Sequence, residues 1–304
     1  MMTYSFPSAL NIHTLSLDRD TCQWAIIEGV LDPIQLSVWA DQKINWFAGY
    51  LFPRMSAFKL EKVMKLFCCL FILDDLMDTL PSNQSLELLE KLLPTQNEKV
   101  SDHKLSPLPR VLNDIVCHVS TFGDTAWGFT FQNYWYRYID AQKWEVLNKQ
   151  SGVLPSFPEY KERRMDSSGV YIALHLLKDT WKSDSCAVRL LDYKVARIIC
   201  LSNDVISMDK ERDAGDFHNE LLLLQHYTGC SSGLLTAYAD NQLKRLVSEV
   251  VVLMDTGDFQ DAEVQDGTKT YIEELKLLVG GCHYWSQQDT LRYGASINGC
   301  LQKN

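Results

Sequence analysis

The sequence KLFCCLFILDDLMDTLP, residues 65–81, decides the fold. Within it, an apolar run of eight residues leads directly into three aspartates, Asp74, Asp75 and Asp78. Apolar side chains recur upstream at helical spacing on the face of Asp74, at Leu60, Val63, Met64, Phe67, Leu70 and Phe71. This pattern predicts one long helix that buries its apolar face, carries the aspartates in its last turns and is ended by Pro81.

Most of the remaining chain also repeats apolar residues at helical spacing, and few segments alternate with the period of two expected of strands. Six more helical segments are expected, at residues 86–93, 111–138 (as one or two helices), 160–178, 188–211, 234–254 and 270–284. We expect Ser85 to cap the first of these and the third to break near Ser167-Ser168-Gly169. Gly215 should end the fourth, and the polar residues 255–267 should form a loop. Because no Gly/Ser/Pro-rich linker divides the chain, residues 1–304 are predicted to form one all-α domain.

The composition excludes several classes of protein. Hydrophobic residues make up 46% of the chain, which is ample for a core, but the apolar run before Asp74 is far too short for membrane insertion. The N-terminus has no basic segment followed by an apolar stretch, so we expect no signal peptide. Nine cysteines without a Cys-x-x-Cys pair argue against a zinc site and predict a reduced, cytoplasmic protein. A net charge of −10 without a basic block argues against nucleic-acid binding.

The first acidic cluster favours a bound divalent cation. Asp74 and Asp78 are four residues apart and share a helical face. Carboxylates in the last turn of a helix oppose its dipole, at a cost of about 0.3–1 kcal/mol each, and repel one another. Mg²⁺, which prefers carboxylates, waters and phosphate oxygens, would offset this cost. A solvated acidic helix end is the plainer alternative, but Phe67 and Phe71 extend the Asp74 face as apolar, inward-facing residues.

The sequence NDVISMDKE, residues 203–211, forms a second cluster about 130 residues later. Asn203, Ser207 and Glu211 recur every four residues, and a straight helix would stack them on one face within about 12 Å. An amide oxygen, a hydroxyl and a carboxylate suit one Mg²⁺ that also binds phosphate oxygens and waters. Lys210 lies beside them and could reach a phosphate as a point charge. An ordinary polar helix end is the alternative, which the pairing with the first cluster disfavours.

At this point the chain resembles a class I terpene synthase (terpene cyclase) of the microbial type. That family carries an Asp-Asp-x-x-Asp motif and a downstream Asn-Asp-x-x-Ser-x-x-Lys-Glu motif, and both stand complete here. The segment 160–164, followed by Gly169, resembles the family's diphosphate-sensing segment, with Arg164 as the sensor and Arg163 as the competing choice. Arg292-Tyr293 resembles the C-terminal pair that closes over the diphosphate. The resemblance implies an all-α bundle around a central cavity.

The resemblance also implies a metal centre of three Mg²⁺ ions, with Mn²⁺ as a substitute. Asp74 would bridge two of the ions, while Asn203, Ser207 and Glu211 would hold the third. Asp78 would bind a metal or support the residues that do.

The substrate implied is a linear prenyl diphosphate, whose C–O bond breaks as negative charge develops on the leaving group. Arg164, Lys210, Arg292 and Tyr293 would then donate hydrogen bonds to the diphosphate oxygens. Asp75 would pair with Arg164 when the site closes. Farnesyl diphosphate is the favoured substrate, and geranylgeranyl diphosphate is the alternative. The product could be a hydrocarbon or an alcohol, and the protein could form a homodimer.

The carbocation formed by this cleavage needs a dry cavity. Phe67 and Phe71 lie one and two turns before Asp74, and their faces would stabilise a cation by about 0.5–2 kcal/mol each. Ser167 and Ser168 stand where a helix break would aim backbone carbonyls at the cavity. Because water must be excluded, closing loops are expected at 80–109 and 211–220.

Two other functions compete with cyclisation. A chain-elongating prenyltransferase uses the same metals, but that family carries two Asp-Asp-x-x-Asp motifs, whereas the second position here has Asn203, Ser207 and Glu211. A helical protein that binds prenyl diphosphates without turnover is the alternative from a different class. The presence of every expected ligand argues against it.

Overall fold

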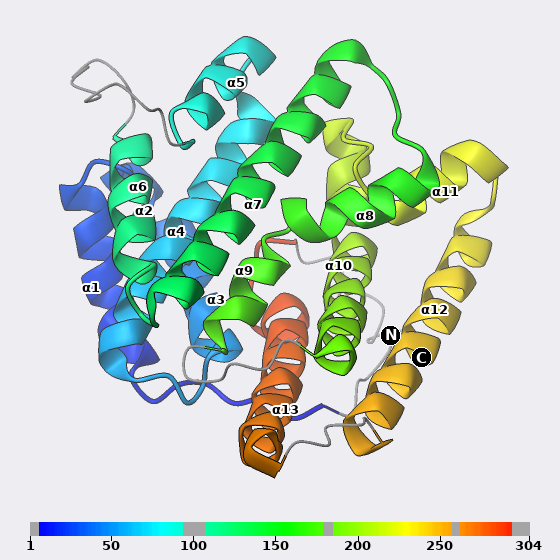
Figure 1. Cartoon of the computed structure of the whole chain (residues 1–304). Coiled ribbons are helices and arrows are strands. Elements are labelled where there is room, and N and C mark those ends of the chain that lie inside the picture. Colours follow the sequence, from blue (N-terminus) through cyan, green and yellow to red (C-terminus); the bar gives the residue numbers. More distant parts are fainter. Residues whose placement is uncertain (1–5, 94–106, 179–184, 257–261, 294–304) are drawn as a thin grey trace, which may run out of the picture.

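The computed structural model describes residues 6–93, 107–178, 185–256 and 262–293, and within these ranges it contains helices and no strands. The first half comprises α1 (Thr14–Ile27), η1 (Pro33–Gln35), α2 (Leu36–Asp41), α3 (Ile44–Leu51), α4 (Ala57–Thr79), α5 (Ser82–Glu90), α6 (Leu108–Val119) and α7 (Thr125–Ser151). The second half comprises α8 (Phe157–Ser167), α9 (Val170–Leu176), α10 (Cys186–Ala214), α11 (Glu220–Thr228), α12 (Ser232–Thr256), α13 (Ala262–Tyr284) and the π-helical turn η2 (Trp285–Asp289). The predicted all-α fold is confirmed (Figure 1).

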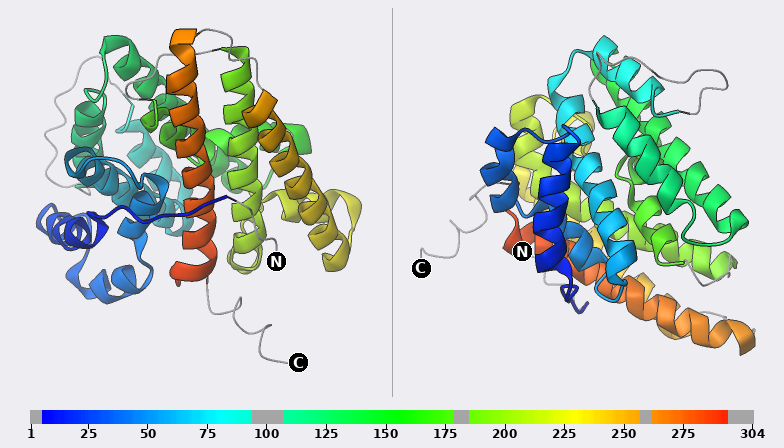
Figure 2. Two further views of the ribbon diagram at one scale, coloured as in Figure 1. Left: turned by 90° about the horizontal axis from the view of Figure 1, so that it is seen from below. Right: turned by 90° about the vertical axis from the view of Figure 1, so that its left-hand side faces the viewer.

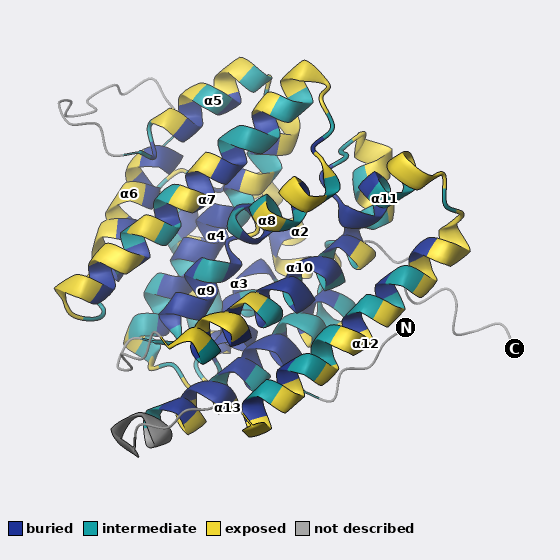
Figure 3. Cartoon of the chain, turned by 45° about the vertical axis from the view of Figure 1, so that its right-hand side comes forward, coloured by how far each residue is buried: buried dark blue, intermediate teal, exposed yellow. Residues whose placement is uncertain are grey.

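The helices pack side by side as one bundle (Figure 2). Helices α1 and α6 pack against α4 from outside, and α12 packs along α10. The burial pattern follows from this arrangement, because the outward faces of α5, α6 and α12 are exposed while the inner parts of α4, α10 and α13 are buried (Figure 3). None of the described helices is both long enough and apolar enough to cross a bilayer.

Helix α4 forms as its sequence pattern predicts. Its middle part, from Leu66 to Leu70, is buried on every side, which is why these residues are apolar without interruption. The helix ends at Thr79, and Pro81 follows in an extended conformation and opens α5. The three aspartates thus lie in the last two turns of a helix that the core holds firmly.

The predicted break in the segment 160–178 is confirmed. Helix α8 ends at Ser167 and α9 begins at Val170, with Gly169 between them at a φ of +69°, a conformation that glycine adopts without strain. Gln142 on α7 donates a hydrogen bond of 2.8 Å to the carbonyl oxygen of Ser167. One end of the break is therefore fixed from α7.

Three local predictions differ from the structure. Ser85 lies inside α5 instead of capping it, because Pro81 already provides a preset start for that helix. Residues 262–267, expected as loop, belong to α13, whose Ala-Glu-Val-Gln start favours a helix despite Gly267. Helix α10 continues to Ala214, so only the later part of the expected loop 211–220 is non-helical. Part of the other expected loop, residues 94–106, lies outside the described residues.

Two adjacent glycines let α13 approach its neighbours at backbone distance. A Cβ atom at Gly280 would clash with the carbonyl oxygen of Pro7, and one at Gly281 with that of Tyr50 on α3. Four residues after Gly281, Trp285 is fully buried and its Nε1 donates to the carbonyl oxygen of Lys43 at 2.8 Å. The C-terminal end of the bundle is thereby tied to the start of α3.

Candidate active site

A cavity lies among α4, α7, α8, α10 and the end of α13 with η2. Most residues predicted to form the site line it, namely Phe67, Phe71, Asp74, Asp78, Arg164, Ser167, Ser168, Asn203, Ser207, Lys210, Glu211, Arg292 and Tyr293. Asp75 is not among the lining residues, but it contacts one of them, Arg292. The fold thus brings the two sequence clusters to opposite walls of one chamber.

Arg292 binds the first cluster as a fork. Its Nη2 donates to Asp75 Oδ1 at 2.6 Å and to Asp74 Oδ2 at 3.0 Å, and its Nη1 donates to Asp75 Oδ2 at 3.2 Å. The Arg292 side chain is only 5% exposed. In this structure Asp75 therefore pairs with Arg292 and not with Arg164, the partner expected on closure.

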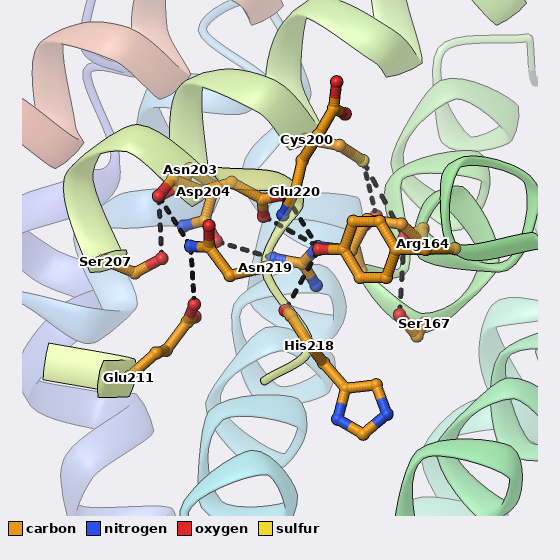
Figure 4. Close-up of polar contacts among 12 residues, drawn as sticks. Arg164, Ser167, Cys200, Asn203, Asp204, Ser207, Glu211, His218, Asn219 and Glu220 are labelled. Carbon is orange, nitrogen blue, oxygen red and sulfur yellow. Dashed lines mark hydrogen bonds and ion pairs between the residues drawn. The ribbon is translucent and has the colours of Figure 1, made fainter. Parts of the chain in front are cut away.

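Arg164 lies on the opposite wall, bound to α10 (Figure 4). Its Nε donates to Asp204 Oδ1 at 3.0 Å and its Nη2 donates to Asn203 Oδ1 at 2.8 Å. Arg163, the competing choice for the sensor, points outward and pairs with Asp140 at 2.7 Å. Of the two arginines, Arg164 is the one in the cavity.

The second cluster shares one helical face, as its spacing predicts (Figure 4). Ser207 Oγ donates to the carbonyl oxygen of Asn203 at 2.8 Å, so both lone pairs of the hydroxyl remain available. Asn203 Nδ2 donates to the Tyr293 hydroxyl oxygen at 3.0 Å, which links this wall to the C-terminal pair. Glu211 Oε2 accepts from Asn219 Nδ2 at 2.8 Å.

Asp204 is a site residue that the sequence interpretation missed. It is fully buried and accepts hydrogen bonds from the Tyr160 hydroxyl at 2.7 Å and from the backbone N–H of Glu220 at 2.9 Å, besides the one from Arg164. It follows Asn203 by one residue and therefore points about 100° away from the ligand face, toward α8 and α11. Its place inside the motif was visible in the sequence, but the helix it would face was not.

Aromatic rings form the apolar part of the cavity. Phe47 on α3 meets Phe67 and Phe71 edge to face, with centroids 5.5 and 5.4 Å apart. Trp285 stands 5.6 Å from Phe71, and the Arg292 guanidinium lies 5.0 Å above the Phe71 ring. Four other aromatic residues, on α7, are absent from the cavity wall and pack in the core, namely Trp127, Phe131, Tyr134 and Trp135.

A polar stripe on α7 also reaches the cavity and was missed. Tyr138, Gln142, Glu145 and Lys149 follow one another at helical spacing and all line the chamber. Burial raises the pKa of Glu145, whose Oε1 has no hydrogen-bond partner. The spacing of these polar residues within an aromatic-rich helix was the available signal.

The donor set fits a divalent cation. Burial and the Asp74 charge raise the pKa of Asp78, and burial and the Asp204 charge raise that of Glu211. Negative charge in the cavity is thus incompletely compensated, which a bound cation would relieve. No three His, Cys, Asp or Glu side chains converge as a metal cluster within the described ranges. A cation here would therefore need the amide and hydroxyl oxygens of Asn203 and Ser207 as well.

Comparisons with known proteins agree with this geometry. A family model described as "Terpene synthase family 2, C-terminal metal binding" matches residues 65–249. The (+)-T-muurolol synthase ((2E,6E)-farnesyl diphosphate cyclizing) of Roseiflexus castenholzii is 24% identical over 296 residues, covering 94% of this chain and 91% of that protein. Pristinol synthase of Streptomyces pristinaespiralis is 25% identical over an alignment of 305 residues, covering 92% and 81%. The crystal structure of α-eudesmol synthase shares the fold, with a TM-score of 0.80 at 17% identity, covering 94% and 98%.

Proposed function

The chain belongs to the terpene synthase family, as a class I enzyme of the microbial type, and on this premise we propose that it cyclises farnesyl diphosphate with Mg²⁺. The product would be a terpene hydrocarbon or alcohol, and diphosphate would be released. The Roseiflexus relative, whose name states that it cyclises farnesyl diphosphate, supports this substrate. Geranylgeranyl diphosphate is the second candidate. We also propose that residues 1–304 act as one catalytic domain.

One observation carries the proposal. Asp74 and Asp78 on α4 face Asn203, Ser207 and Glu211 on α10 across a single cavity whose other end is aromatic. Oxygen donors at one end suit a diphosphate with its cations, and aromatic rings at the other suit an isoprenoid chain. The arrangement thus matches both parts of a prenyl diphosphate.

The residues at the polar end would hold the leaving group. Mg²⁺, when bound by the two clusters, supplies the positive charge that stabilises the diphosphate as the C–O bond breaks. Arg292 would turn from the carboxylates of the first cluster to the diphosphate oxygens, and Arg164 and Lys210 would donate from the α10 side. The Tyr293 phenol is a donor at neutral pH, and burial raises its pKa further, to about 12.

The aromatic end would govern the carbocation. The faces of Phe67 and Phe71 would stabilise the positive charge, and Trp285 would complete the wall. The backbone carbonyl at the α8–α9 break, beside Ser167 and Ser168, adds a fixed dipole. Exclusion of water by these walls would protect the intermediate until a proton is lost or a water is admitted.

A substrate panel tests this function. Geranyl, farnesyl and geranylgeranyl diphosphate are each incubated with the protein and Mg²⁺, and hexane extracts are analysed by gas chromatography with mass spectrometry. We expect a cyclic fifteen-carbon product from farnesyl diphosphate. Longer diphosphates would indicate the chain-elongating prenyltransferase, and recovery of all three substrates would indicate a protein that only binds them.

A further inference from the structure

Lys149 connects the two acidic walls of the cavity. Its Nζ lies 3.2 Å from Asp78 Oδ1 on α4 and 2.5 Å from Asp216 Oδ2, in the segment that follows α10. Asp216 is held in turn by His218, whose backbone N–H and Nδ1 lie 2.8 and 2.9 Å from its Oδ1. All four side chains line the cavity. A single ammonium group thus bridges the aspartate-rich helix to the far wall.

The charges keep this bridge ionised. Burial opposes protonation of Lys149, but the charges of Asp216 and Asp78 outweigh it and raise the pKa of the ammonium group. Burial also acts against the Asp216 carboxylate, yet the hydrogen bond from His218 and the Lys149 charge hold its pKa well below the usual value. Lys149 is therefore a fixed cation beside Asp78.

A divalent cation and this ammonium would compete for the negative charge of Asp78. Both bind the same carboxylate, and two positive charges a few ångströms apart repel. Lys149 can leave Asp78 without becoming unpaired, because Asp216 remains its closer partner. The exchange would therefore cost one ion pair only.

We propose that Lys149 is a positioning residue that competes with the divalent cation for Asp78 and so sets the cation affinity of the site. This inference rests on the proposed metal-dependent function. It differs from the assignment of Arg292, which faces Asp74 and Asp75 and would itself contact substrate. Lys149 acts through Asp78, and its effect is present before any substrate binds.

The chain offers a matched control on the same helix. Lys143 also lies on α7, its side chain is 23% exposed against 26% for Lys149, and it pairs with Glu90 at 3.6 Å. It does not line the cavity. Replacing either lysine by methionine removes the same charge from the same helix, but only one replacement frees Asp78.

The test is a Mn²⁺ titration of the substrate-free protein, followed by the electron paramagnetic resonance signal of the free ion. We expect Lys149→Met to lower the Mn²⁺ dissociation constant by about two- to fivefold, the range of a partly exposed ion pair. Lys143→Met and Lys149→Arg should bind like the wild type. If Lys149→Met loses helical circular dichroism, Lys149→Gln takes its place.

A double-mutant cycle separates competition from simple charge repulsion. In an Asp78→Asn background, Lys149→Met should no longer change the Mn²⁺ dissociation constant. The inference would be overturned by an unchanged Mn²⁺ dissociation constant in Lys149→Met, or by an equal gain in Mn²⁺ affinity when Lys149→Met is made in the Asp78→Asn background. A higher KM for the diphosphate substrate with no change in Mn²⁺ binding would also overturn it. If the wild-type protein binds no Mn²⁺, the proposed metal site is overturned as well. If it binds Mn²⁺ with the same affinity as Lys149→Met, only the role of Lys149 is rejected.

Discussion

Arg164 and Asp204 form an ion pair inside the protein, with Nε and Oδ1 3.0 Å apart and side chains that are 13% and 1% exposed. The pair connects α8 to α10 directly behind the proposed metal ligand Asn203. Asp204 thus fixes the position of the Arg164 side chain in the substrate-free protein. A buried arginine that loses its counter-charge is far more costly than one at the surface.

Replacing Asp204 by asparagine should therefore lower the free energy of unfolding by about 3 kcal/mol, since it leaves the Arg164 charge uncompensated. Urea denaturation followed by circular dichroism measures the change. Asp140→Asn is the control, because it removes the exposed partner of Arg163 and should cost at most about 1 kcal/mol. Equal losses in the two variants would contradict the anchoring role of Asp204.

Asn203→Leu should lower turnover of farnesyl diphosphate by more than about 100-fold, since mutation even of residues that support metal ligands costs 10–100-fold. The helical circular-dichroism signal should persist, because Asn203 is only partly buried. Asn113→Leu, at an exposed position on α6, is the control for the change of residue type. Wild-type turnover in Asn203→Leu would reject the ligand assignment.

Phe71→Ala should alter the product distribution and slow product formation by about 2- to 30-fold, through the loss of one aromatic face from the cation. Gas chromatography of the hexane extract measures both effects. Phe58 lies on the same helix but is 63% exposed, so Phe58→Ala should leave the profile unchanged. An identical profile and rate for Phe71→Ala would place that ring outside the reaction.

His175 should make the folded state sensitive to acid. Burial lowers its pKa from 6.5 to about 4, so between these values the unfolded chain binds a proton that the folded chain does not. Stability is then complete above pH 6.5 and falls by up to about 3 kcal/mol as the pH approaches 4.

Urea denaturation at several pH values, compared with His175→Gln, measures this contribution. Glutamine can still donate to the carbonyl oxygen of Trp127, the group within 3.0 Å of His175 Nε2, and the variant should show a shallower slope over this range. His118→Gln, on the exposed side of α6, controls for loss of an imidazole. If the free energy of unfolding of His175→Gln depends on pH as steeply as that of the wild type, groups other than His175 cause the acid sensitivity.

Chelation should abolish turnover of the wild-type protein, since the two clusters are proposed to act through Mg²⁺. Readdition of Mg²⁺ or Mn²⁺ should restore it, whereas Ca²⁺, with its longer bonds and looser geometry, should restore less. Product formation after treatment with EDTA and gel filtration measures the effect. Full activity in metal-stripped buffer would refute the metal assignment.

Periodicity predicted much of the architecture because α4 and α10 are long and strongly patterned. It also placed Asp74 and Asn203 correctly on inward faces, since a helical face follows from spacing alone. The same spacing does not say which helix that face meets. Asp75 pairs with Arg292 and Asp204 anchors Arg164 because of contacts between elements distant in the sequence. Those partners depend on packing, which spacing does not encode.

The position of Lys149 was missed for a related reason. Its nearest neighbours on the same face of α7 are Glu145 and Gln142, and a lysine that follows polar residues near the end of a helix is normally solvated. Its partners, Asp78 on α4 and Asp216 after α10, are both distant in the sequence, so its place at the cavity depends on packing. The boundary at residues 262–267 was missed because Gly267 and several polar residues outweighed the helix formers in the pattern, although α13 includes them.

The glycine pair in α13 has a consequence for product diversification. Any side chain at position 281 would have to push α13 away from the Tyr50 carbonyl, and the indole of Trp285, one turn later, would shift with it. The shape of the proposed substrate cavity thus depends partly on backbone spacing outside the cavity. Redesign of the product would have to treat this spacing as a determinant alongside the rings proposed to contact the substrate.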